Sequence, residues 1–76
     1  MMRRFHDTGG SEWTVAVSAG SYGAITLMFA RTGDTGVSWL ALEAENAAEA
    51  QAMLADLSDD ELRARLEHSQ WWVAGE

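Results

Sequence analysis

The stretch Ala24-Ile25-Thr26-Leu27-Met28-Phe29-Ala30-Arg31 is the longest run in this chain that suits a β-strand, and glycine-containing segments lie on both sides of it. Its residues alternate with a period of two, which places Ile25, Leu27 and Phe29 on one face of a strand and a row of smaller residues on the other. The sequence therefore predicts a central strand whose bulkier row faces a hydrophobic core.

The segments before and after this stretch predict further strands. Residues 12–18 alternate cleanly, as expected of a half-buried strand, and residues 37–43 follow a second glycine-containing turn. Residues 3–6 precede an Asp-Thr-Gly-Gly turn and predict a shorter edge strand. Because the connections are short, we expect an antiparallel meander of three to four strands.

The strand at residues 37–43 is compatible with two orientations, because a shift of one residue exchanges its faces. The first orientation turns Val37, Trp39 and Ala41 toward the helices, and the second turns Ser38, Leu40 and Leu42 toward them. We favour the second orientation. It leaves Val37 and Trp39 on the opposite face of the sheet together with Met28, as part of an apolar surface of the kind that often marks association.

Two helices are predicted in the second half of the chain. Asn46 with Glu49 three positions later is typical of a helix N-terminus, and five alanines favour a helix over residues 47–57. Ser58 and Glu61 form a second capping box, so another helix begins immediately after the first.

The second helix is expected to run through Leu62 and Leu66 toward the tryptophan pair at residues 71 and 72. Counting by helical periodicity, Trp72 falls near the stripe of these leucines and Trp71 falls beside it. We therefore expect Trp72 to dock on the core and Trp71 to lie at its rim, where an aromatic side chain is available to a partner.

Together these patterns predict a single compact α+β domain over residues 1–76, in which an antiparallel three- to four-stranded meander sheet is followed by two C-terminal helices packed on one face. A chain of 76 residues with 47% hydrophobic residues is long enough for one modest core. The expected core combines aliphatic and aromatic side chains from strands and helices: Val15, Val17, Ile25, Leu27, Phe29, Leu40, Leu42, Leu54, Leu57, Leu62 and Leu66.

Negative charge is concentrated in the C-terminal half. The net charge of the chain is −7; residues 1–44 contain three Arg and four acidic residues, whereas residues 45–76 contain two Arg and eight acidic residues. Five Arg and no Lys argue against direct nucleic-acid binding. A solvated helical surface is the simplest interpretation, and the alternatives are a surface for a basic protein partner or a nucleic-acid mimic.

No catalytic arrangement, metal site or cofactor motif is predicted. The loop at residues 20–23 matches no phosphate-binding motif, and His6 and His68 lie at opposite ends of the chain. The acidic run at residues 59–61 is explained by helix capping. The absence of cysteine excludes disulfides and thiolate metal clusters. With neither a secretory signal nor a membrane-length apolar run, we expect a cytoplasmic protein with no membrane contact.

These features favour a small non-enzymatic protein-interaction or regulatory module that forms a homodimer. Its candidate interaction residues are Met28, Val37, Trp39 and Trp71. The alternative is a small ligand-binding or enzymatic subunit with a pocket formed between protomers from Tyr22, Arg31, Trp39 and a histidine. A concave pocket with convergent polar groups favours the alternative, and a flat contact surface favours the module.

Overall fold

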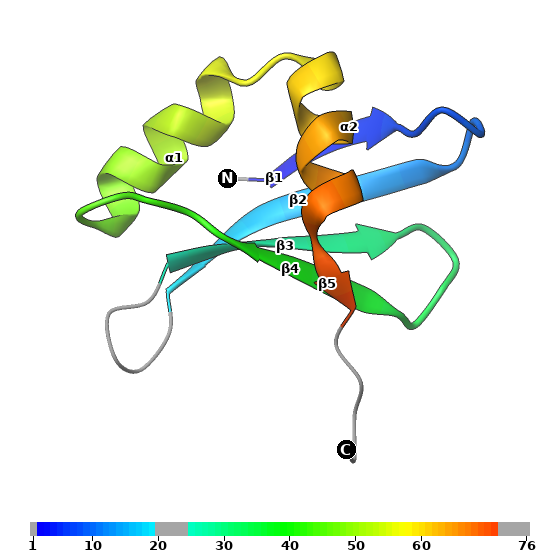
Figure 1. Cartoon of the computed structure of the whole chain (residues 1–76), viewed down its shortest axis with the longest axis horizontal. Helices are drawn as coiled ribbons and strands as arrows, with labels where there is room; N and C mark the ends of the chain where they lie inside the picture. Colours follow the sequence, from blue (N-terminus) through cyan, green and yellow to red (C-terminus); the bar gives the residue numbers. More distant parts are fainter. Residues whose placement is uncertain (1, 20–24, 72–76) are drawn as a thin grey trace.

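The computed structural model describes residues 2–19 and 25–71, in which one antiparallel sheet carries two helices on one side (Figure 1). The sheet order is β1-β2-β3-β4-β5, so consecutive strands are neighbours. The elements in chain order are β1 (Met2–His6), β2 (Glu12–Ala19), β3 (Ile25–Arg31), β4 (Val37–Ala41), α1 (Ala47–Asp56), α2 (Asp59–His68) and β5 (Gln70–Trp71). The predicted α+β class, meander order and pair of helices are confirmed. None of the described helices is long and apolar enough to cross a membrane.

The fifth strand differs from the predicted three to four. Helix α2 ends at His68, the C-cap residue Ser69 has extended backbone (φ −74°, ψ 158°), and β5 then pairs with β4. Ser69 Oγ donates to the Leu66 carbonyl at 2.6 Å and lies 3.0 Å from the hydroxyl of Ser38. These polar contacts end the helix and begin the strand pairing. The prediction that α2 continues to Trp71 is therefore wrong, and Trp72 lies outside the described residues.

The register of β4 selects the second of its two predicted orientations. Leu40 pairs with Leu27, and Ser38 pairs with Phe29. Paired residues in an antiparallel sheet lie on the same face, so Ser38 and Leu40 face the helices with the bulky row of β3. Trp39 pairs with Met28 on the other face.

The core lies between the sheet and the helices. Most predicted core residues are buried, and Val17, Leu40 and Leu66 are partly buried and pack against them. The prediction omitted Phe5 and Ala50, which are also buried, whereas Trp13 is buried as the alternation of residues 12–18 predicts. Phe5 makes an edge-to-face contact with Phe29, with ring centroids 6.1 Å apart, so even the short edge strand contributes an aromatic to the core.

Both predicted helix caps form. Asn46 Oδ1 accepts from the Glu49 N–H at 2.8 Å. At the second helix, Ser58 Oγ accepts from the Glu61 N–H and the Glu61 carboxylate accepts from the Ser58 N–H, each at 3.1 Å. The two helices therefore follow each other with only Leu57 and Ser58 between them, and they meet at a corner above the sheet (Figure 1).

Candidate interaction surface

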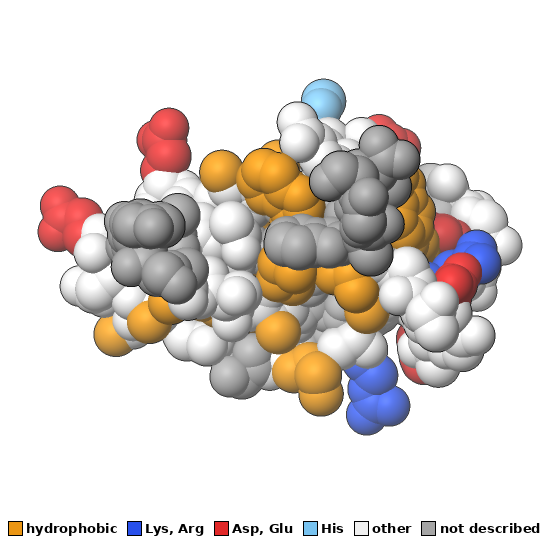
Figure 2. Space-filling model, turned by 90° about the horizontal axis from the view of Figure 1, so that it is seen from below, with side chains coloured by type: hydrophobic (Ala, Val, Ile, Leu, Met, Phe, Trp, Pro, Cys, Tyr) orange, Lys and Arg blue, Asp and Glu red, His pale blue; other side chains and the backbone are white. Residues whose placement is uncertain are grey.

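The sheet face turned away from α1 and α2, called the helix-free face, carries a cluster of apolar side chains. Ala16, Met28 and Trp39 form one row across β2, β3 and β4, and Ala30 and Val37 pair in the next row. We call these five residues the apolar patch. All five are half-buried in the chain. Figure 2 views the molecule from the side, turned by 90° from Figure 1, and shows hydrophobic side chains near its middle.

The apolar patch contains no charged residue. By register, the charged strand residues on the helix-free face are Arg4 and Glu12 on β1 and β2, where His6 also lies. Glu12 accepts a hydrogen bond from the Thr32 hydroxyl at 3.0 Å. The opposite charges of Arg4 and Glu12 cancel, so this face is close to neutral in a chain of net charge −7.

Trp71 does not belong to this surface. It pairs with Ser38, so it lies on the helix side of the sheet. Its ring packs against Trp13 with centroids 5.8 Å apart, and a Cβ atom on Gly36 would lie 3.0 Å from its Cζ3. Trp71 remains 56% exposed. Trp71 therefore lies at the rim of the core, as predicted, but it belongs to strand β5 and not to a helix, and its ring packs beside Trp13.

The buried ring of Trp13 is held by a loop carboxylate. Its Nε1 donates to Asp7 Oδ2 at 2.7 Å, while Asp7 Oδ1 accepts from the backbone N–H groups of Gly9 and Ser11 at 2.9 Å. The Trp13 hydrogen bond, followed by that of Ser11, lowers the pKa of Asp7. Asp7 is thus a structural carboxylate that closes the β1–β2 turn.

The residues of the alternative pocket are not brought together within the described chain. Arg31 pairs with Trp13 on the helix side of the sheet and forms an ion pair with Asp34 at 2.6 Å, whereas Trp39 lies on the helix-free face. Tyr22 lies outside the described residues. A pocket shared by two protomers would have to join residues from opposite faces of the sheet.

Two depressions on the described surface are open to solvent. One lies between α2 and β4 and is lined by Leu40, Glu61, Ala64, Arg65 and His68; the other is lined by Glu43, Ala44, Glu45 and Glu49. In the first, the Glu61 carboxylate is engaged with Ser58 in the capping box, which lowers its pKa. Among the described residues, no group of three His, Cys, Asp or Glu side chains is placed to hold a metal ion.

Comparison of the chain with protein-family models, curated proteins and solved structures found no match.

Proposed function

We propose that this protein is a non-enzymatic protein-interaction or regulatory module that forms a homodimer through the apolar patch. The observation that carries the proposal is the cross-strand pair of Met28 and Trp39, with Val37 in the adjacent row, on a sheet face that neither α1 nor α2 covers. A contiguous apolar surface on one face of a small domain often marks association with another protein.

The charge distribution favours a second copy of the chain over a basic partner at this face. Six of the seven net negative charges belong to residues 45–76, the part of the chain that includes both helices. A basic protein would be attracted to that half of the molecule. The nearly neutral helix-free face instead suits an identical surface, since symmetric dimers use the same patch on both subunits.

Trp39→Glu tests this proposal directly. A carboxylate at the centre of the contact would be desolvated on association, so we expect the variant to be monomeric at concentrations where the natural chain is a dimer. The fold should persist, because Trp39 lies outside the core. Analytical ultracentrifugation measures the association, and circular dichroism melting measures the fold.

Trp71→Glu is the matched control, since it places the same charge on an exposed tryptophan on the other side of the sheet. This variant should remain a dimer. A natural chain that is monomeric at high micromolar concentration, or a Trp39→Glu chain that unfolds, would contradict the proposal.

A further inference from the structure

On the helix-free face, the side chains of β4 are larger than those of β2. Met2 on β1 pairs with Ala16 and is 65% exposed, so Ala16 lies between two methionines in its row. Met28 on β3 and Val37 and Trp39 on β4 are large. The neighbouring strand β2 presents only Thr14 and Ala16 in the same two rows. In the row of Met28, the side chains therefore increase in size from Ala16 to Trp39.

We infer that two copies pack these faces together about a twofold axis parallel to β3, so that Trp39 of each copy lies over the partner's Ala16. The inference rests on the proposed self-association and specifies its geometry. Rotation about such an axis exchanges the strands on either side of β3, which brings β4 of one copy over β2 of the other. Met28 then faces the partner's Met28, and Val37 lies over the partner's Thr14.

Packing favours this axis over the other simple choice. An axis in the interface but perpendicular to the strands would place β4 over β4, so that Trp39 meets the partner's Trp39 while Ala16 faces the partner's Ala16. Large side chains would then hold the sheets apart, and a gap would remain above the alanines. Protein interfaces and interiors pack densely, and a gap of this kind loses the dispersion contacts that close packing provides. The axis along β3 places a large side chain over a small one on both sides of that strand, so these contacts are kept.

The position of Arg4 agrees with the same axis. Arg4 lies on β1, two strands from β3, and faces the helix-free side. With the axis along β3, the two copies of β1 lie at opposite edges of the dimer, four strand spacings or roughly 19 Å apart. The perpendicular axis would stack β1 on β1 and bring both Arg4 side chains to one edge. The first arrangement therefore keeps these like charges at opposite edges of the dimer, separated by more than a Debye length.

An exchange of side-chain size between β2 and β4 tests the arrangement. Ala16→Trp alone should raise the dimer dissociation constant by roughly tenfold or more, because it places an indole where the partner's Trp39 lies. Trp39→Ala alone should also weaken the dimer. The double variant Ala16→Trp with Trp39→Ala should recover much of the affinity, because each large side chain again faces a small one. Under the perpendicular axis, Ala16→Trp would instead fill the gap and strengthen the dimer.

Thr14→Phe combined with Val37→Ala provides a second exchange in the adjacent row, should the first pair lower the melting temperature. Ala52→Trp, on the exposed surface of α1, is the control and should leave the dimer unchanged. Sedimentation equilibrium gives the dissociation constants, and thermal melting reports the fold of each variant.

The outcomes separate the two proposals. Single variants that dimerise more weakly, together with a double variant whose dimer affinity recovers, support the axis along β3. A dimeric natural chain that is broken by Trp39→Glu, but for which neither exchange recovers affinity, overturns this axis and leaves the proposed function standing. A natural chain that stays monomeric overturns both proposals.

Discussion

Asp7 is the residue that couples the first turn of the chain to the core. Its carboxylate accepts two backbone N–H groups of the turn and the indole N–H of Trp13, whose ring is only 5% exposed. These hydrogen bonds favour the charged form of the carboxyl and hold its pKa below the usual range. Protonation therefore weakens both the turn and the anchoring of Trp13.

Folding stability should consequently fall in acid. A carboxyl whose pKa is lower in the folded state contributes stability above its unfolded pKa, about 3.9 for Asp, and that contribution is lost as the pH falls through the folded value. Asp34 and Glu61 have lowered pKa values as well and act in the same direction. We expect Asp7→Asn to reduce, without abolishing, the loss of unfolding free energy between neutral pH and acid.

Urea unfolding of the natural chain and of Asp7→Asn, at neutral pH and at a pH below the Asp range, measures this difference. Asp56→Asn, at the exposed end of α1, is the control. A loss of stability in acid that is equal for the natural chain and Asp7→Asn would show that the Asp7 hydrogen bonds do not contribute.

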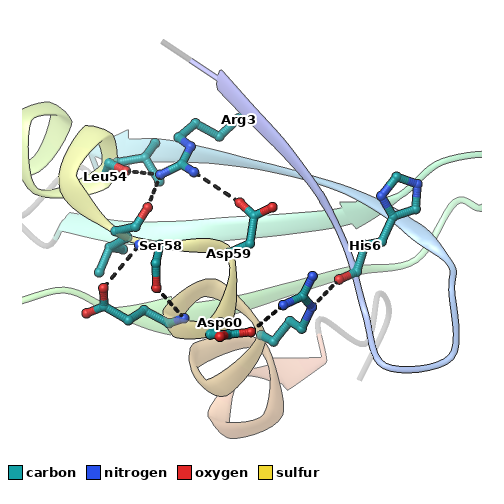
Figure 3. Close-up of polar contacts among 9 residues, drawn as sticks. Arg3, His6, Leu54, Ser58, Asp59 and Asp60 are labelled. Carbon is teal, nitrogen blue, oxygen red and sulfur yellow. Dashed lines mark hydrogen bonds and ion pairs between the residues drawn. The ribbon is translucent and has the colours of Figure 1, made fainter.

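The corner between the two helices depends on a side chain from the opposite end of the chain. Helix α1 has no basic residue in its last turn, where the final carbonyl groups need donors. Arg3 on β1 supplies them, since its Nη1 donates to the carbonyl oxygens of Leu54, at 2.8 Å, and Leu57, while Nη2 contacts Asp59 at 3.2 Å (Figure 3). β1 thereby holds the end of α1 and the start of α2.

A second arginine links the same strand to α2. Arg63 Nε donates to the His6 carbonyl at 2.5 Å, and its Nη1 pairs with Asp60 at 2.6 Å (Figure 3). Arg3 extends from β1 to the helices, and Arg63 extends from α2 to β1. The two side chains together link the edge strand to the helices. This linkage explains why β1 is well integrated although the pattern of its sequence is weak.

Arg3→Gln should destabilise the protein by about 1–3 kcal/mol, because it removes charge-assisted hydrogen bonds to carbonyl groups at the end of α1. The Asp59 contact is partly exposed and contributes little of this. Arg4→Gln is the matched control, since Arg4 is exposed on the other face of the same strand, and it should change stability by no more than about 0.5 kcal/mol. Chemical unfolding measures both values, and similar small effects would remove Arg3 from this role.

At the scale of the whole molecule, the charge and the apolar patch lie on different sides. The acidic helical half carries most of the net charge, and the helix-free face is nearly neutral. Two copies that associate through the patch bury apolar area while two net charges of −7 repel each other. Salt screens that repulsion and leaves the apolar contact in place.

Raising the ionic strength from about 0.02 M to about 0.5 M should therefore lower the dimer dissociation constant. Sedimentation at the two salt concentrations measures the change. Weaker association in salt would indicate that ion pairs drive assembly, which the uncharged patch does not predict.

The strands β2, β3 and β4 and both helix starts could be predicted from the sequence because they depend on residues close together in the chain. Alternation with a period of two identifies β2, β3 and β4, and each helix start depends on a hydrogen bond that spans three residues, as at Asn46 and Ser58. The grouping of Met28, Val37 and Trp39 on one surface was predicted as well, but only through a choice between two orientations of β4, since a shift by one residue would have reversed it.

Contacts between distant residues decided the rest. Two-residue β5 has no pattern of its own and exists because Ser69 and Trp71 meet Ser38, more than thirty residues earlier in the chain. The burial of Phe5 depends on Phe29, and the use of Arg3 depends on the end of α1. By itself the sequence determined the fold class, three strands, both helix starts and the row of apolar residues, because each follows from propensity and hydrogen bonds among near neighbours. Only the tertiary structure decided strand β5, the separation of Trp71 from Trp39 and the linkage of β1 to the helices, because each requires the chain to be folded before the interacting groups meet.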